Sequence, residues 1–202
     1  MSETKEFILK TAFSLFIQKS FKEVTMNEIV KATGLSKGAF YHYFESKEKL
    51  FIEVINSFYF DKMVFDYAKL NHNSLREFYL DYINEVKQLI QNFKMFLNYE
   101  DAGTNINYVT LMFDALKLFP GFRDRVKEEQ KKELNAWASV IKNARDKKEF
   151  CSPMSDEQIA RMFIYSNDGI GLYLLLNGNF DNAHSEMLNL WDNFYKEIAD
   201  CV

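Results

Sequence analysis

The sequence predicts an all-α protein. Apolar residues recur at helical spacing along most of the chain, and no segment alternates apolar and polar residues as a strand would. The only two prolines, Pro120 and Pro153, fall at apparent breaks between helices. With 202 residues, 48% of them hydrophobic, the chain can form a small N-terminal domain at residues 1–48 and a larger helical domain at residues 49–202.

Two short helices separated by a glycine turn are predicted near the N-terminus. Thr25 precedes an apolar-periodic run and has Glu28 three positions later, which is the spacing of a capping box. The run ends at Gly34, because glycine accepts a left-handed backbone at little cost. Ser36 then caps a second helix that extends to Phe44. This arrangement predicts a helix-turn-helix, whose second helix enters the major groove of DNA.

The second helix is predicted to have an inward and an outward face. At 100° per residue, Phe40 and Phe44 share one stripe and pack inward. The other sides carry small residues, an imidazole and two phenols: Gly38, Ala39, His42, Tyr41 and Tyr43. An aromatic core box is the alternative interpretation, but so short a helix cannot bury the imidazole and both phenols as well. The pattern therefore favours contacts with base edges and phosphates.

The charge of the chain qualifies this interpretation. The formal net charge is −4, whereas residues 1–60 hold eight lysines against seven acidic residues and so carry +1. Such a domain binds DNA if its few cations face the phosphates, as Lys47 beside a helix N-terminus would. We therefore expect modest, salt-sensitive affinity.

Residues 25–50 resemble the signature of the TetR-type bacterial transcriptional regulators. The matching residues are Thr25, the run GLSKGAFYHYF from Gly34 to Phe44, and SKEKL from Ser46 to Leu50. The resemblance implies phosphate contacts by Thr25, Tyr41, Tyr43 and Lys47. It implies base reading by Ser36, Lys37, Gly38, Ala39 and His42. The chain departs from the family pattern at Ser20, where glycine is usual, and at Ala39, where threonine is common.

The remaining sequence is predicted to form further helices. Ser74 with Glu77 and Ser155 with Gln158 have the spacing of capping boxes. Including the first helix of the N-terminal domain, the expected ranges are about 3–20, 46 toward 70, 74–98, 106–119, 122–148, 155–177 and 182–200.

The last two helices predict a homodimer. From Ile159 to Leu176 apolar residues occupy almost every side, and a helix that is apolar all round must be covered all round. Two such helices from each of two chains would form a four-helix interface, which is also where the resemblance places the dimer contact. The candidate interface residues are Gly171, Leu174, Trp191, Phe194 and Ile198. The alternative is a helix buried within a monomer.

The middle helices are rich in aromatic residues. Taken alone, such residues are more typical of an ordinary hydrophobic core than of a ligand cavity. The resemblance implies that they enclose a small, largely apolar effector. The candidate ligand-binding residues are Tyr82, Phe96, Tyr108, Phe113, Trp137, Phe163 and Asn167.

Together these features predict a ligand-responsive DNA-binding transcriptional regulator, a repressor that binds a near-palindromic operator in double-stranded DNA as a homodimer. The resemblance implies that a small molecule releases it. The alternatives are a helical regulator that acts through a protein partner without an inducer, and a small helical enzyme.

The enzyme alternative has little support, because no HExxH, GxSxG or phosphate-binding glycine loop is present. No catalytic residue, metal or cofactor is predicted. Cys151 and Cys201 lie far apart and are expected to be reduced thiols of a cytoplasmic protein. The polar N-terminus does not read as a signal peptide, and the uncharged run from Gly169 to Phe180 is too short to span a bilayer, so no membrane association is expected.

Overall fold

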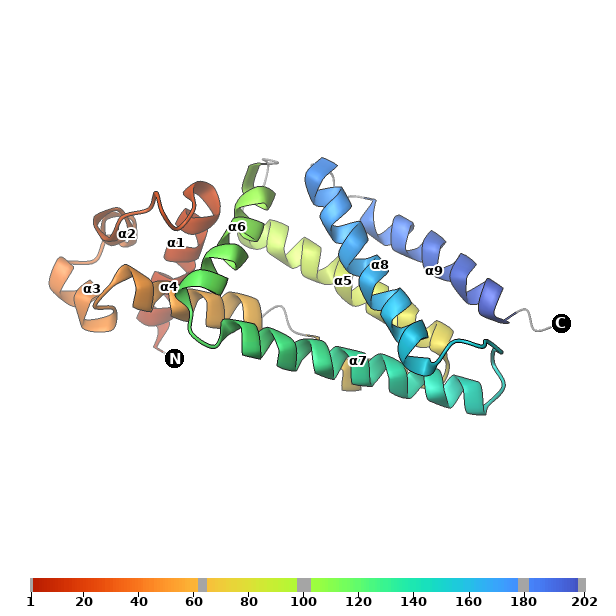
Figure 1. Cartoon of the computed structure of the whole chain (residues 1–202). Helices are drawn as coiled ribbons and strands as arrows, with labels where there is room; N and C mark the ends of the chain where they lie inside the picture. Colours follow the sequence, from red (N-terminus) through yellow and green to blue (C-terminus); the bar gives the residue numbers. More distant parts are fainter. Residues whose placement is uncertain (1, 62–64, 98–102, 178–181, 200–202) are drawn as a thin grey trace. The chain divides into compact units, whose positions relative to one another are not determined.

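The computed structural model describes residues 2–61, 65–97, 103–177 and 182–199, and within these ranges all regular structure is helical (Figure 1). The all-α prediction is therefore confirmed. The α-helices are α1 (Glu3–Lys19), α2 (Met26–Thr33), α3 (Lys37–Tyr43), α4 (Lys47–Ile55), α5 (Leu75–Leu97), α6 (Gly103–Leu118), α7 (Phe122–Asp146), α8 (Asp156–Asn177) and α9 (Ala183–Ala199). A π-helical turn at Asn56–Phe60 and a 3-10 turn at Tyr67–Lys69 complete the described elements.

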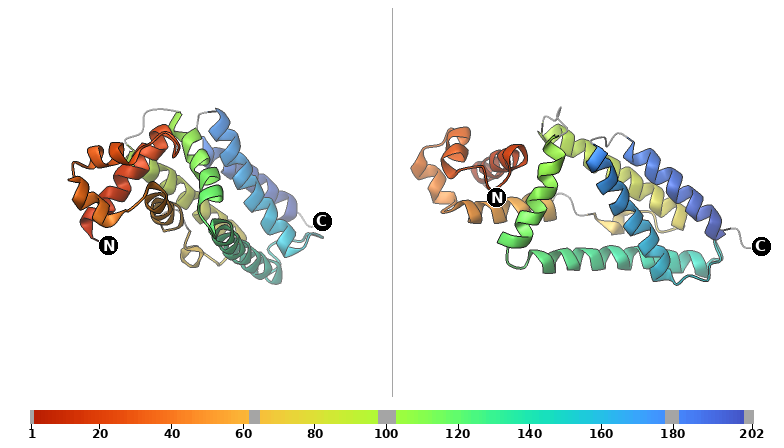
Figure 2. Two further views of the ribbon diagram at one scale, coloured as in Figure 1. Left: turned by 60° about the vertical axis from the view of Figure 1, so that its left-hand side comes forward. Right: turned by 45° about the horizontal axis from the view of Figure 1, so that its top comes forward.

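The chain divides into two compact units. The first comprises Met1–Val64 and Tyr99–Arg125, and the second comprises Phe65–Asn98 and Val126–Val202. In the first unit, α1 packs against α2, α4 and α6. In the second, α9 packs against α5 and α8 (Figure 2). The domain boundary between residues 48 and 49 stays a prediction.

Serine and threonine caps begin the helices as the sequence indicates. The hydroxyls of Thr25, Ser36 and Ser46 accept hydrogen bonds from the backbone N–H groups three residues ahead, at 3.2 Å in each case. Ser155 forms a reciprocal box, because its hydroxyl accepts from the Gln158 N–H while its own N–H donates to the Gln158 side chain. Each cap satisfies a backbone donor that has no partner inside the helix.

The long helix predicted from Ser46 toward Leu70 is wrong. The α-helix ends at Ile55, and a π-turn follows in which the Asp61 N–H donates to the Asn56 carbonyl at 3.0 Å. Phe58 and Phe60 are both buried, although two positions two residues apart lie on different sides of an α-helix. The extra residue in the turn allows both rings to face the core. The Arg125 guanidinium packs over the Phe60 ring at 4.0 Å and donates to the Asn56 side chain.

Aromatic side chains form the centre of the second unit. Trp137 is fully buried and stacks on Phe163, with ring centroids 4.8 Å apart. The edges of Phe78 and Trp191 meet it at 4.9 and 5.5 Å. The indole N–H of Trp191 donates to the Ser166 hydroxyl at 2.9 Å, which satisfies this buried polar group.

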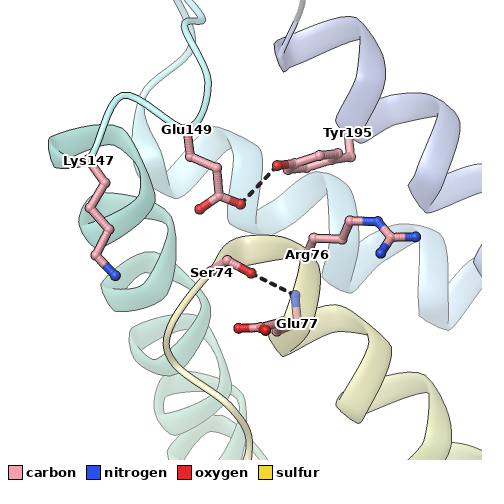
Figure 3. Close-up of a pocket in the computed structure, with 6 residues that line it drawn as sticks. All are labelled: Ser74, Arg76, Glu77, Lys147, Glu149 and Tyr195. Carbon is pink, nitrogen blue, oxygen red and sulfur yellow. Dashed lines mark hydrogen bonds between the residues drawn. The ribbon is translucent and has the colours of Figure 1, made fainter.

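Glu149 joins three helices at one end of this unit (Figure 3). Its carboxylate accepts the Leu75 N–H at the start of α5, at 3.1 Å, and the Tyr195 hydroxyl of α9, at 2.9 Å. It follows Lys148, whose φ of 58° ends α7 in a left-handed conformation. A shallow depression surrounds it, lined also by Ser74, Arg76, Glu77 and Lys147. The negative charge at the N-terminus of α5 also complements that helix dipole.

The expectation of reduced thiols is wrong for Cys151, which is disulfide-bonded. Its backbone N–H donates to the Ile198 carbonyl at 3.1 Å, so the segment after α7 is held beside the end of α9. Cys201 lies outside the described residues.

In the part of the chain that the structure describes, no helix is long and apolar enough to cross a membrane.

We predict that Glu149→Ala lowers the free energy of unfolding by about 1–3 kcal/mol, because it leaves the Leu75 N–H and the Tyr195 hydroxyl without their acceptor. Urea denaturation followed by circular dichroism measures the change. Glu85→Ala, which removes an exposed carboxylate on α5 that forms no ion pair with a described residue, is the matched control and should shift stability by less than about 0.5 kcal/mol. Equal stability of the two variants would contradict the role given to Glu149.

Candidate nucleic-acid interface

Helix α3 presents the two faces expected from the sequence. Phe40 and Phe44 are buried. The side chains on the remaining surface are exposed, apart from Tyr43, which is half-buried: Ser36, Lys37, Gly38, Ala39, Tyr41 and His42. The small residues at positions 38 and 39 leave the backbone of α3 accessible, as close approach to base edges requires. Their roles in DNA binding stay predictions.

The turn between α2 and α3 is fixed by a glycine and a buried hydroxyl. Gly34 has φ 67°, a left-handed conformation that strains other residues. The Thr33 hydroxyl is buried and donates to the Val30 carbonyl at 2.8 Å, while it accepts the Leu35 N–H at 3.4 Å. These bonds set the start of α3 relative to α2.

Thr25 and Glu28 close the start of α2. The Thr25 side chain is exposed and its hydroxyl accepts the Glu28 N–H, so it stands at the helix N-terminus where a phosphate can approach. The Glu28 carboxylate pairs with Lys19 at 2.5 Å. The hydrogen bond from Lys19 lowers the pKa of Glu28, and the Thr25 N–H contributes in the same direction.

Lys47 has a structural role in addition to the predicted phosphate contact. Its ammonium donates to the carbonyls of Phe21 and Val24, both at 2.8 Å, and lies 4.4 Å from the centroid of the Phe21 ring. These bonds tie the connection between α1 and α2 to the first residue of α4. A lysine ammonium has three donors, so one remains for a phosphate oxygen.

Three lysines of this domain are exposed and form no ion pair with any described residue: Lys22, Lys31 and Lys37. In contrast, Lys5, Lys19 and Lys49 pair with Glu53, Glu28 and Glu45. Of these three lysines, only Lys37 was predicted from the sequence as a DNA-contacting residue. Lys22 precedes the first helix of the helix-turn-helix and Lys31 lies within it, but whether a lysine is paired is visible only once the helices are packed.

The structure brings together only some of the predicted ligand-binding residues. Tyr82, Trp137 and Phe163 are buried in the second unit and their rings are in contact through Trp137, at 5.3 and 4.8 Å. Asn167 lies half-buried on α8. Phe113 belongs to α6 in the first unit and is 58% exposed. The side chains of Phe96 and Tyr108 lie outside the described ones.

The predicted dimer residues divide in a similar way. Leu174, Trp191 and Ile198 are buried inside their own chain, and Phe194 packs on Phe163 at 5.3 Å. Gly171 faces open space. The large apolar side chains of α8 and α9 that remain exposed are Met162, Tyr165, Leu172, Tyr173, Leu176 and Leu190.

Among the described residues, no three His, Cys, Asp or Glu side chains are grouped to hold a metal ion. The polar groups around α3 are instead hydroxyls, phenols, an imidazole and lysines, which are the groups that contact phosphates and base edges.

Comparison with known proteins agrees with this chemistry. Residues 8–54 match the family model described as "Bacterial regulatory proteins, tetR family". YuxN of Bacillus subtilis (strain 168), described as an uncharacterized HTH-type transcriptional regulator, is 45% identical over 62 residues, which are 31% of this chain and 21% of YuxN. The HTH-type transcriptional repressor BepR of Brucella suis biovar 1 is 24% identical over 166 residues, 81% of this chain and 76% of BepR.

Solved structures extend the likeness to the whole fold. A regulator protein from Saccharomonospora viridis, solved in complex with choline, is 18% identical, with a TM-score of 0.68 over 97% of each chain. At that identity the likeness shows the fold alone: an N-terminal helix-turn-helix domain followed by a helical domain.

The turn between α2 and α3 and the exposed face of α3 define a helix-turn-helix domain of the DNA-binding type. Its N-terminal domain is similar to that of the TetR family of bacterial regulators. Both named relatives are described as transcriptional regulators, which does not favour the enzyme alternative. The match to YuxN spans about a fifth of that relative, so sequence similarity at this level is confined to the DNA-binding part.

We predict that Lys47→Met destabilises the N-terminal domain by about 1–3 kcal/mol. The partly buried carbonyls of Phe21 and Val24 lose their donor, while the apolar part of the side chain is retained. Thermal unfolding by circular dichroism measures this. Lys49→Met, on the same helix but paired only with exposed Glu45, should leave stability nearly unchanged. If Lys47→Met unfolds at the same temperature as the unmodified protein, the Lys47 ammonium has no structural role.

Proposed function

We propose that this protein is a ligand-responsive transcriptional repressor that binds a near-palindromic operator as a homodimer. Each subunit inserts α3 into one major groove, with half-site centres at least about one helical turn apart, ~34 Å. The exposed face of α3 is the observation that carries this proposal, because Phe40 and Phe44 turn inward and leave Lys37, Tyr41 and His42 outward.

The dimer is supported by the apolar surface of α8 and α9. Six of the described large apolar side chains are exposed on these two helices, and Leu172, Tyr173 and Leu176 fall together on consecutive turns. Leaving such a surface in water is unfavourable, and a second copy of the same pair of helices covers it by two-fold symmetry. We therefore place the subunit contact on this exposed side rather than on the buried Leu174, Trp191 and Ile198.

A small, largely apolar effector acting through the second unit is the remaining part of the proposal. The aromatic centre around Trp137 and the choline complex of the Saccharomonospora viridis protein support a small-molecule site in this unit. Release from DNA on binding follows the family resemblance. We further propose that the protein acts in the cytoplasm, where operator DNA is found.

We predict that His42→Ala weakens operator binding by roughly 1–3 kcal/mol and relaxes base preference at one position of each half-site. Lys31→Gln, on α2, should instead weaken all sequences alike and reduce the slope of affinity against salt, because its exposed ammonium loses a phosphate contact. Fluorescence-anisotropy titrations with the protein's own upstream DNA, at several salt concentrations, separate the two effects. Lys19→Gln, whose ammonium already pairs with Glu28, is the control. Unchanged titrations for both His42→Ala and Lys31→Gln would remove the helix-turn-helix from the DNA contact.

We predict that Leu172→Glu dissociates the dimer without unfolding the subunit, because Leu172 is 53% exposed in the single chain but would bury an unpaired charge in the interface. Multi-angle light scattering measures the mass. Met95→Glu, at a residue of α5 that is 69% exposed, is the matched control and should remain dimeric. An unmodified protein that is monomeric at micromolar concentration would end the dimer proposal.

A further inference from the structure

The second unit contains a carboxylate surrounded by aromatic hydroxyls and rings. Glu133 lies half-buried on α7, and the Tyr82 hydroxyl donates to its Oε1 at 3.1 Å. Tyr67 interacts with the same carboxylate. Burial raises the pKa of Glu133, although the hydrogen bond from Tyr82 acts in the opposite direction. Burial therefore disfavours the negative charge of Glu133, and the two hydroxyls offset part of that effect.

Stacked rings extend from this carboxylate. Phe65 lies parallel to Tyr82 at 4.8 Å, and Tyr82 contacts Trp137 at 5.3 Å. Trp137 is one helical turn after Glu133 on α7, so both side chains leave the same face of the helix. Trp137 in turn stacks on Phe163 of α8.

A second carboxyl group interacts electrostatically with this cluster. Asp168, on α8, is close enough to raise the pKa of Glu133, Tyr67 and Tyr82 through its charge. Its side chain stays accessible to solvent, and the neighbouring protein still raises its own pKa. Among the described residues, neither Glu133 nor Asp168 forms an ion pair with a lysine or arginine, and the contact of Asp168 is with the Asn167 amide at 3.5 Å.

The Trp137 indole adds an independent observation. Its N–H is fully buried and has no hydrogen-bond acceptor among the described residues. A buried donor without an acceptor loses the hydrogen bond that it makes to water in the unfolded chain, so such groups are rare in folded proteins. The same ring contacts Tyr82, the donor to Glu133, and so lies beside this hydroxyl–carboxylate pair.

We propose that the carboxyl–aromatic cluster formed by Tyr67, Tyr82, Glu133, Trp137, Phe163 and Asp168 is a binding site for an organic cation that also carries a hydrogen-bond acceptor. Two carboxylates without a counter-ion attract the cation, aromatic faces favour a quaternary ammonium group over a metal ion, and the Trp137 N–H meets the acceptor atom. This inference rests on the proposed function only in naming the effector class; binding itself requires no DNA.

The test uses two cation–isostere pairs on the full-length protein without DNA. Benzoylcholine and acetylcholine each carry a quaternary ammonium and an ester carbonyl, while 3,3-dimethylbutyl benzoate and 3,3-dimethylbutyl acetate replace the nitrogen by carbon and are neutral. Isothermal titration calorimetry should show at least one cation binding about tenfold or more tightly than its neutral partner, since each tenfold corresponds to about 1.4 kcal/mol of charge recognition. Binding of both members alike, or of neither cation, overturns the proposal without any substitution.

Conservative variants assign the effect to the cluster. Glu133→Gln and Asp168→Asn should each remove most of the preference for the cation, whereas Trp137→Phe, which keeps the ring, should weaken the cation and the neutral ester alike. Glu128→Gln, an exposed acid on the same helix, is the matched control and should bind as the unmodified protein does. A preference that survives both carboxyl variants places the cation elsewhere and also overturns the proposal.

The outcome is separable from that of the proposed function. Operator titrations without any cation test DNA binding alone. A protein that binds its operator but shows no cation preference refutes only the cluster assignment. A protein that prefers the cations but never binds DNA refutes only the repressor.

Discussion

The burial of Phe40 and Phe44 is the constraint on which the DNA-reading surface depends. Helix α3 has seven residues, and helices of this length are not stable alone in water. Its rotation is therefore set by the side that the rest of the domain buries. Lys5 of α1 lies 5.7 Å from the Phe44 ring and pairs with Glu53 of α4, so three helices meet around this stripe. Once the two rings are inside, the small residues and the imidazole can only face outward.

The first unit extends beyond the helix-turn-helix. Helix α6 packs against α1 and α4, and Arg125 at the start of α7 holds the π-turn after α4 through Asn56 and Phe60. The helices that hold α3 in place thus pack against α6 and the start of α7, which lie more than fifty positions later in the sequence. Helix α7 contributes its first residues to the first unit and the rest to the second.

The second unit relies on phenol–carboxylate bonds at the edge of an aromatic core. Tyr79 donates to Asp192 at 2.5 Å, Tyr195 to Glu149 at 2.9 Å and Tyr82 to Glu133 at 3.1 Å. Burial and the bond to Glu149 raise the pKa of Tyr195 to about 12, so this phenol remains a donor throughout the neutral range. The first two bonds fasten α5 and the loop after α7 to α9, whereas the third occurs where a second carboxyl lies nearby without a cation.

The sequence alone determined the features that depend on neighbours a few residues apart. The caps at Thr25, Ser36, Ser74 and Ser155, the glycine turn and the two faces of α3 follow from hydrogen bonds and periodicity within one or two helical turns. Tertiary packing decided what depends on distant partners. It ended α4 at Ile55, because Phe58 and Phe60 both reach the core. It buried Trp191 inside its own chain rather than leaving it on a dimer surface, and it directed the Lys47 ammonium to the carbonyls of Phe21 and Val24. Helical spacing shows that a helix has an apolar face. Only the packed neighbours show whether that face contacts the same chain or another molecule.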